Sequence, residues 1–315
     1  MNRLGTPVLV VVLGLLLVAG IGGFLPSYYV GLATEALIVA LFVMSLDLLV
    51  GFTGLESLGH AAFFGVGAYV AGLLSLSGTS NVFVLLAAST VATGLLGALF
   101  GAVALRAVGP YFLIITLALG YLPWALAIRW RSLTGGDDGL SGIFLPDLGF
   151  GYSLDGQKQY FTFVVVLFFC CSIVLGAVGR SSFGLCLRGI KDSPSRMEAL
   201  GYDIWLHKYL AFIIAAFFAG IAGALFALYN GFVSPENLSL YRSAEALVAV
   251  ILGGPGTLIG PAVGAIFILF LRSAVGSFTQ HWGSILGVIY ILVVLFAPRG
   301  LFFAASRLLS PSKEV

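Results

Sequence analysis

Charged residues are scarce in this chain. Only 9% of its 315 residues are Asp, Glu, Lys or Arg, whereas soluble domains carry about 25%. Hydrophobic residues make up 60% of the chain, and its mean hydropathy is +1.11. This composition excludes an ordinary soluble domain and predicts a protein that crosses a membrane several times.

The sequence also lacks the common patterns of catalysis and metal binding. It has no GxxxxGK[ST] phosphate loop and no HExxH, GxSxG or CxxC motif, so it shows no device for holding ATP or activating a nucleophile. Its three cysteines, Cys170, Cys171 and Cys186, lack metal-ligand spacing and are interpreted as packing residues. Its three histidines are widely separated. We therefore expect neither an enzyme nor a metal site.

The chain contains many long apolar runs. A helix needs about 20 residues to cross a hydrocarbon core of roughly 30 Å. The first run is longer than the core of a signal peptide, which favours a retained span. The predicted spans lie near residues 8–25, 29–50, 57–77, 82–105, 111–129, 160–179, 208–229 and 283–297, with a broken region at 243–277. The fold class is an all-α membrane protein of about 8–10 transmembrane or re-entrant helices.

Lys and Arg residues predict the orientation, because they gather in cytoplasmic loops. The densest basic cluster lies in the loop of residues 180–208. Placing this loop in the cytoplasm also places both termini there, if the spans alternate. The region 243–277 must then enter and leave the membrane on the same side. Residues 244–253 make only ~15 Å of helix, which fits a re-entrant hairpin that turns at Gly253–Pro261.

The loop 180–208 has its own helix signals. Asp192 or Ser193 can cap a helix that begins at Pro194, and Gly201 can end it. We expect two short helices broken near Asp192. They should expose a basic face and four apolar side chains, Leu185, Ile190, Met197 and Leu200. Two interpretations stay open on these features: an ordinary positively charged loop, or a surface on which a cytoplasmic partner docks.

The stretch "GFTGLESLGHAAFFGVGAY", residues 51–69, places two ionisable residues in an apolar run. Glu56 and His60 are four residues apart, which predicts one shared helix face. Ionisable groups within a membrane are costly and are candidates for function. This face either borders a passage or packs against another helix. Glu35, Asp47 and Glu245 are also candidates, and a structural hydrogen bond between helices is the favoured interpretation for them.

Several motifs, taken together and in order, resemble a known family. They are "GFTGLESLGHAAFFGVGAYVAGLL", "YFLIITLALGY", "LTGGDDGLSGI", "SSFGLCLRGIKDSPSRMEALGYDIWLHKYLAFIIAAFFAGIAGALFA", "VILGGPGTLIGPAVGA" and "FAPRGL". The family is the integral permease subunit, of the LivM type, of ATP-binding-cassette importers for branched-chain amino acids. The chain departs from it at Glu56, at Leu185 and Cys186, and at 135–139. These departures affect solute identity more than fold.

The resemblance implies one transmembrane permease domain over residues 1–315, with the fold of the vitamin B12 and ribose importers, in a bacterial inner membrane. It implies a second homologous permease, two cytoplasmic ATPases that use the ATP, and a periplasmic amino-acid-binding protein. This chain itself would bind no cofactor. Urea, short amides or other amino acids stay open as solutes, and an ion-coupled secondary carrier is the rival class of protein.

The resemblance assigns the segment 180–208 to coupling with the ATPase. The candidate coupling residues are Arg188, Asp192, Pro194, Arg196, Met197, Glu198, Leu200 and Gly201. The candidates for the translocation pathway are polar residues of the predicted spans. They are Glu56, Ser57, His60, Thr116, Tyr121, Asn230 and Glu245.

Overall fold

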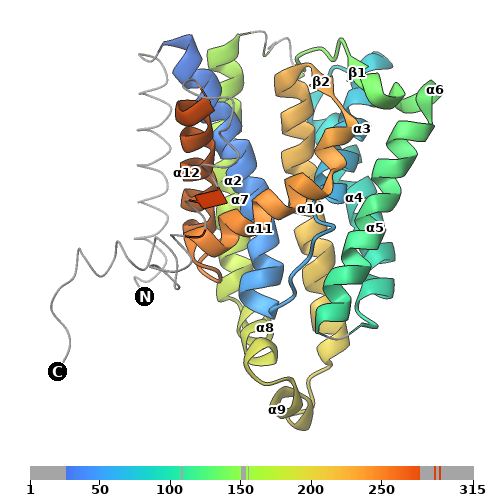
Figure 1. The fold of residues 1–315 in the computed structure, drawn as a ribbon. Coiled ribbons are helices and arrows are strands. Elements are labelled where there is room, and N and C mark those ends of the chain that lie inside the picture. Colours follow the sequence, from blue (N-terminus) through green and yellow to red (C-terminus); the bar gives the residue numbers. More distant parts are fainter. Residues whose placement is uncertain are drawn as a thin grey trace, which may run out of the picture.

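The structure is a computed structural model that describes residues 26–107, 109–149, 154, 156–276, 287–288 and 291. The span predicted near 8–25 lies outside the described residues, as does nearly all of that near 283–297. Within the described part, helices dominate, and the predicted all-α class is confirmed. The N-terminal helix of this part is α2 (Figure 1).

Six described helices are long and apolar enough to cross a membrane. They are α2 (Ser27–Thr53), α4 (Val82–Ala104), α5 (Pro110–Arg129), α7 (Gln157–Arg180), α10 (Ile204–Asn230) and α12 (Ile259–Gly276). A shorter apolar helix, α3 (Ala61–Leu76), lies among them. Their bounds agree with the predicted spans to within a few residues, except at the start of α3. The chain is a multi-pass membrane protein.

Helices α2 and α10 form the centre of the bundle: 19 of the 27 residues of α2 and 12 of the 27 residues of α10 are buried. Lipid tails give apolar helices little reason to associate, so close packing of small residues holds such bundles together. Gly67 of α3 lies against Gly220 of α10, where a Cβ would collide with the facing backbone. Gly223 of α10 lies equally close to the carbonyl of Phe64. The abundant glycines therefore bring α3 and α10 into backbone contact.

The segment between α2 and α3 corrects the sequence prediction. Helix α2 ends at Gly54, whose φ is +71°, and residues 54–60 are not helical. The segment runs from the end of α2 to the middle of the bundle, where α3 begins (Figure 1). The expected helix over 57–77 therefore begins only at Ala61. The prediction that Glu56 and His60 share a helix face is wrong, because Glu56 lies in the non-helical segment 54–60 and α3 begins only after His60.

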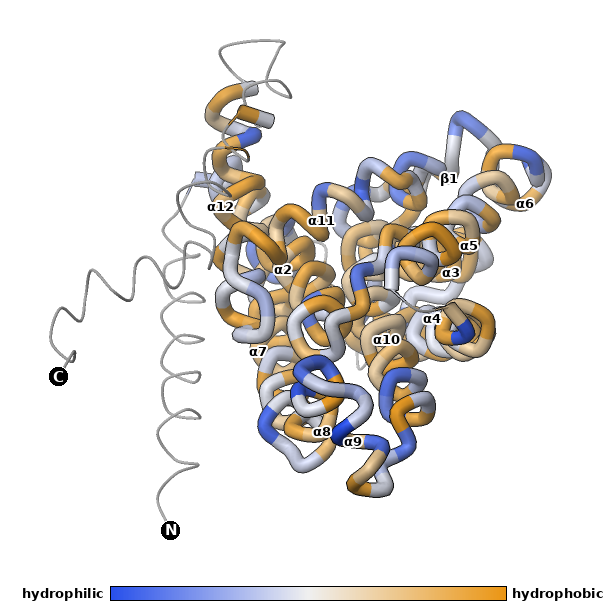
Figure 2. The backbone as a smooth tube through the Cα atoms, turned by 60° about the horizontal axis from the view of Figure 1, so that its bottom comes forward, coloured by the Kyte–Doolittle hydropathy of each residue, from blue (hydrophilic) through white to orange (hydrophobic). Residues whose placement is uncertain are grey.

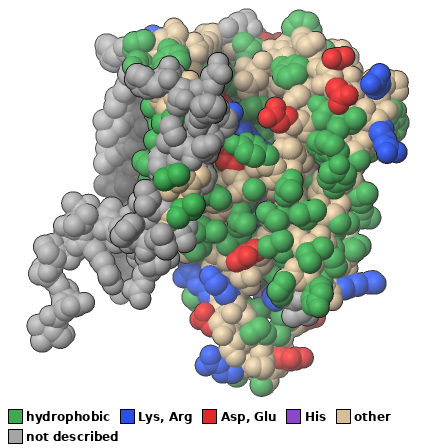
Figure 3. Space-filling view, viewed as in Figure 1, with side chains coloured by type: hydrophobic (Ala, Val, Ile, Leu, Met, Phe, Trp, Pro, Cys, Tyr) green, Lys and Arg blue, Asp and Glu red, His purple; other side chains and the backbone are tan. Residues whose placement is uncertain are grey.

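The two ends of the bundle differ in character. One end carries α8 (Ser182–Asp192) and α9 (Pro194–Ala199), in which hydrophilic residues alternate with hydrophobic ones (Figure 2). The opposite end carries α6 (Arg131–Thr134), the short helix η1 (Gly136–Asp138) and a small antiparallel pairing of β1 (Leu140–Ser141) with β2 (Phe232–Val233). Basic side chains gather around α8 and α9 in Figure 3. The loop 180–208 and the loop after α5 thus lie at opposite ends.

The chain after α10 returns toward the middle of the bundle. It passes through η2 (Pro235–Leu238) into α11 (Leu240–Gly253), which crosses the bundle obliquely (Figure 1). A turn of residues 254–258 then leads into α12. The sequence predicted a break in this region. That it is re-entrant in a membrane stays a prediction.

Candidate functional site

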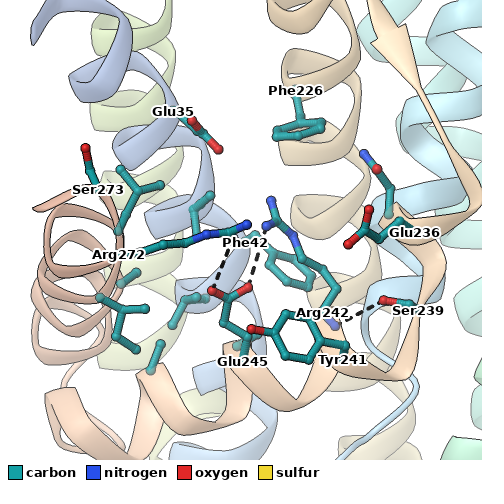
Figure 4. A pocket seen from close by; sticks show the side chains of 18 of the residues that line it. Glu35, Phe42, Phe226, Glu236, Ser239, Tyr241, Arg242, Glu245, Arg272 and Ser273 are labelled. Atoms are coloured by element: carbon teal, nitrogen blue, oxygen red, sulfur yellow. Dashed lines mark hydrogen bonds and ion pairs between the residues drawn. The ribbon is translucent and has the colours of Figure 1, made fainter. Parts of the chain in front are cut away.

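A cavity lies between α2, α10, η2, α11 and α12. Its volume is about 520 Å³, within the range of small-molecule sites. Aliphatic and aromatic side chains such as Val39, Phe42, Phe226 and Ile268 form much of its wall. Five charged side chains also line it: Glu35, Glu236, Arg242, Glu245 and Arg272. We call this space the charged cavity (Figure 4).

Glu245 lies between two arginines. Oε2 of Glu245 is 3.6 Å from Nη1 of Arg242, one turn earlier on α11. Oε1 of Glu245 is 3.8 Å from Nη1 of Arg272 on α12. Both distances exceed those of charge-assisted hydrogen bonds, which are about 2.7–2.9 Å. The carboxylate is therefore held by charge more than by hydrogen bonds.

Aromatic rings fix the position of Arg242. Its guanidinium carbon lies 5.2 Å from the ring centroids of both Phe64 and Phe226. Its buried Nη2 has no hydrogen-bond partner, and the same holds for Nδ2 of Asn237, another residue of the cavity wall. Buried polar groups normally have partners. Two unpaired donors at one cavity indicate a place for a ligand that accepts hydrogen bonds.

The charged cavity holds only one of the seven predicted pathway residues, Glu245. Glu35 faces Arg242 and Arg272 from α2 in Figure 4, and Glu236 lies on the opposite wall. Among the described residues, no group of three or more His, Cys, Asp or Glu side chains is placed to hold a metal ion. The cavity thus presents charges of both signs beside apolar walls.

Ser57 and Thr116 meet at the extended segment 54–60. Oγ1 of Thr116 on α5 accepts a hydrogen bond from the backbone N–H of Leu58 at 3.3 Å. Oγ of Ser57 accepts one from the N–H of Gly59 at 3.4 Å. Both hydroxyls are buried. They satisfy backbone groups that a helix would otherwise pair, so both residues shape the segment.

His60 lies in the core. Its side chain is fully buried and its Nε2 is 2.9 Å from Oγ of Ser45 on α2. Its ring stacks on Phe42 with centroids 5.3 Å apart. These contacts tie the start of α3 to α2. His60 is therefore an architectural residue in this structure.

The remaining predicted residues lie apart from the charged cavity. Tyr121 on α5 borders a second, mainly apolar cavity of about 340 Å³, next to Trp124. Asn230 is at the exposed end of α10, where its Nδ2 donates to the carbonyl of Phe226 at 3.0 Å. Glu56 is exposed on the segment 54–60. The seven residues therefore do not form one site.

The seven predicted pathway residues do not include the two arginines of the charged cavity, Arg242 and Arg272. A signal was present, because Arg242 and Glu245 have the i, i+3 spacing of a helical ion pair in the otherwise apolar stretch "SLYRSAEALVAVILG". The partnership with Arg272 depends on how α12 folds back, and no local pattern encodes it.

The segment 180–208 folds into two short helices, as expected. Helix α8 ends at Asp192 and α9 begins at Pro194, while Gly201 has a φ of +85°. The expectation that Ile190 is presented at the surface is wrong, because this side chain is buried under α8. Met197 packs against Gly189 between the two helices.

Two apolar side chains of this segment do face outward. Leu185 is 61% exposed and Leu200 is 73% exposed. The candidate coupling residues Asp192, Pro194, Arg196, Glu198 and Gly201 are also exposed. Arg188 and Lys191 instead reach back toward the bundle, where each donates to a backbone carbonyl. The segment therefore exposes one surface, while Arg188 and Lys191 contact the bundle.

Three features define the class of protein: a bundle of membrane-crossing helices, a broken helix beside a charged cavity, and paired short helices at one end. They indicate a transport subunit of a membrane importer. The sequence matches the family described as "Branched-chain amino acid transport system / permease component" over residues 28–297. This chain belongs to that family.

Curated relatives support the assignment. The chain is 29% identical over 294 residues to the high-affinity branched-chain amino acid transport system permease proteins LivM of Salmonella typhimurium and Escherichia coli, covering 86% of this chain and 69% of each relative. It is 28% identical over 138 residues to the autoinducer 2 import system permease protein LsrC of Klebsiella pneumoniae, covering 41% of this chain and 40% of that relative. No solved structure matches significantly.

Proposed function

We propose that this chain forms, with a second homologous permease subunit, the translocation pathway of an ATP-driven importer of branched-chain amino acids. Separate cytoplasmic ATPases hydrolyse the ATP, and a periplasmic binding protein delivers the solute. The end that bears α8 and α9 faces the cytoplasm, and both termini lie on that side. This chain supplies the passage and carries out no chemistry.

The charged cavity is the observation that carries the proposal. A branched-chain amino acid has a carboxylate, an ammonium group and an aliphatic side chain. Arg242 and Arg272 present cations to the carboxylate, and Glu35 and Glu236 present anions to the ammonium group. The aliphatic side chain meets apolar walls. Urea and short amides carry no charge and would not need ionised groups, which are costly within a membrane.

Irregular backbone supports a pathway on the side of the bundle where 54–60 and α11 lie. Backbone that is not helical persists at membrane depth only where protein or water covers it. The segment 54–60 reaches the middle of the bundle, and Glu56 is exposed on it (Figure 1). Lipid would satisfy neither the backbone nor the carboxylate. We infer that the second permease and the aqueous passage cover this surface.

The outward surface of α8 and α9 is the proposed contact with an ATPase. Leu185 and Leu200 supply apolar anchors, and charged side chains such as Arg196 and Glu198 surround them. An interface of this kind needs a pre-formed surface, because ordering a free loop reduces affinity. Helices capped at Ser181 and broken at Ser193 provide one.

Substitution of Arg272 tests the passage. Arg272→Gln removes a cation from the charged cavity, and its partly exposed position makes misfolding a small concern. We expect leucine uptake by the assembled importer in proteoliposomes to fall at least tenfold, in line with about 1.5–3 kcal/mol for a charged hydrogen bond. The matched control, Arg131→Gln, removes an exposed arginine of α6 at the end of the bundle and should transport normally.

Three results would overturn the proposal. Equal leucine uptake by Arg272→Gln and by Arg131→Gln would exclude the charged cavity from the passage. Uptake of urea at a rate equal to that of leucine would contradict the solute. Isolation of an active transporter without ATPase subunits would favour an ion-coupled carrier.

A further inference from the structure

Asp47 is a fully buried carboxylate in α2 that does not face the charged cavity. Its Oδ1 accepts a hydrogen bond from the backbone N–H of Gly256 at 2.7 Å, and its Oδ2 accepts one from the N–H of Leu258 at 2.9 Å. Both donors belong to the turn between α11 and α12. One side chain of α2 thus holds a turn that lies more than 200 residues later in the sequence.

The turn needs such a partner. Gly254 and Gly256 have φ values of +104° and +85°, and Leu258 has a φ of +62°. Leu258 is the one residue other than glycine, among those the structure describes, with a positive φ. That conformation costs roughly 1–3 kcal/mol and persists only where surrounding contacts enforce it. The carboxylate of Asp47 provides this enforcement and pairs two backbone N–H groups of the turn, one of which, that of Leu258, is buried.

Helix α8 contacts the same place. Nζ of Lys191 donates to the carbonyl of Gly51 at 2.9 Å, one helical turn after Asp47. Nη2 of Arg188 is 3.4 Å from the carbonyl of Gly256, and its guanidinium lies 4.6 Å from the ring centroid of Phe52. We call this set of contacts among α2, α8 and the turn 254–258 the Asp47 junction. It joins the paired short helices to the broken helix.

Helices α11 and α12 connect the Asp47 junction to the charged cavity. Gly253 of α11 lies against Gly260 of α12, and Gly264 lies against the carbonyl of Ala249, so the two helices are in backbone contact and should move together. Helix α11 has 14 residues, about 21 Å of helix, and carries Arg242 and Glu245 near its start. Arg272 is on α12. A displacement of the turn therefore displaces the cations that line the cavity.

We propose that Asp47 is a positioning residue through which movement of α8 reaches the charged cavity. The inference rests on the proposed function, in which α8 and α9 meet an ATPase. Displacement of α8 moves Lys191 and Arg188, and with them Gly51 and Gly256. Asp47 fixes the turn 254–258 to α2. Because the turn is held in this way, a displacement of α8 also displaces α11 and α12. The geometry of the cavity then follows the state of the ATPase.

Asp47→Asn tests this role with little change of volume. An amide accepts at its oxygen only, so its NH2 group faces one of the two N–H donors and that bond is lost. In the complete importer in proteoliposomes, we expect ATP hydrolysis within twofold of wild type and leucine uptake per ATP reduced at least tenfold. An assembled variant with unchanged uptake per ATP would overturn the inference, because a merely structural residue would lower both rates in proportion.

Lys191→Gln tests the same junction from the exposed end of α8. We expect uptake per ATP to fall at least threefold, and this variant decides the question if Asp47→Asn does not assemble. The matched control is Arg106→Gln, an exposed basic residue after α4 that belongs to neither site. Equal uptake per ATP for Lys191→Gln and Arg106→Gln would contradict the junction.

A third variant separates this inference from the proposed function. Leu200→Asp changes the outward surface of α9 and leaves the Asp47 junction intact. If Leu200→Asp keeps uptake and ATP hydrolysis coupled, the assignment of α8 and α9 to the ATPase fails. If Leu200→Asp uncouples them but Asp47→Asn does not, only the role of Asp47 fails.

Discussion

Two acidic side chains inside the bundle, Asp47 and Glu245, have opposite surroundings. Asp47 is fully buried and accepts two backbone hydrogen bonds at 2.7 and 2.9 Å. Glu245 faces a cavity, its side chain is 16% exposed, and its two arginine partners are 3.6 and 3.8 Å away. The first carboxylate is paired with backbone groups at hydrogen-bond distance. The second is paired with side chains at longer distances, beside a cavity.

The difference shows that the turn 254–258 has a fixed geometry, whereas the ion pairs of the charged cavity are longer and less constrained. Short hydrogen bonds to backbone groups hold Asp47 in one geometry, and loss of the bond from Leu258 leaves a buried donor unpaired. The longer ion pairs of Glu245 fix its carboxylate less tightly. The junction and the charged cavity are linked by α11, so the fixed element can position the adaptable one.

Removal of the Asp47 carboxylate should have the largest effect on stability. Asp47→Ala removes the partner of the N–H groups of Gly256 and Leu258, and the buried N–H of Leu258 alone costs about 1–3 kcal/mol when unpaired. We expect a clear fall in the thermal unfolding midpoint of the detergent-solubilised subunit and weak assembly. A midpoint equal to that of wild type would show that the turn does not depend on this side chain.

A methyl group at Gly51 should destabilise the contact between Asp47 and the turn 254–258 by steric overlap. The Cβ of Gly51→Ala would collide with Oδ1 of Asp47 and with the backbone of Gly256. Overpacking of this kind costs typically 1–3 kcal/mol. We expect a lowered unfolding midpoint and faster amide hydrogen exchange in the peptide that contains residues 254–258. Gly176→Ala is the control, since a Cβ there meets no atom within 4 Å in the described structure.

Glu245→Gln should change transport more than stability. The amide competes less well than the carboxylate for Arg242 and Arg272, so the carboxylate of leucine should bind more tightly and leave more slowly. We expect the KM for leucine uptake and the maximal rate both to fall, by roughly three- to tenfold, the effect of ~1 kcal/mol. A raised KM would show that Glu245 binds the solute directly and does not compete with it.

Tyr121→Ala should have the smallest effect. Tyr121 borders the apolar cavity and pairs with Trp124, with ring centroids 4.5 Å apart. An aromatic pair contributes about 0.5–1.5 kcal/mol beyond its buried area. We expect leucine uptake within twofold of wild type. A tenfold loss of uptake with normal assembly would place the pathway at the second cavity and not at the charged one.

The sequence predicted the helices well because apolar run length is a local property. The spans within the described residues, the break after Gly253 and the two short helices of residues 182–199 follow from hydropathy, proline and glycine. The sequence did not predict that residues 54–60 are extended. The glycine-spaced apolar run looks helical, but hydroxyls of Thr116 and Ser57 pair the backbone instead.

The candidate site was predicted only in part, and the reason is physical. Glu245 was identified because an ionisable residue in an apolar run is costly. Its partner Arg272, and the donors that hold Asp47, come from segments whose approach depends on tertiary folding. Glu56, which the sequence made prominent, is exposed on the segment 54–60 and is separate from the charged cavity.

Protection of a cysteine in the charged cavity tests the central claim most directly. Ser273 lines this cavity, so Ser273→Cys can be introduced after the three native cysteines are replaced. In the assembled importer, leucine should slow maleimide labelling of this cysteine, whereas leucinamide, which lacks a carboxylate, and urea should not. Labelling that leucine leaves unchanged, or that urea slows equally, would contradict a charged cavity that receives the amino acid.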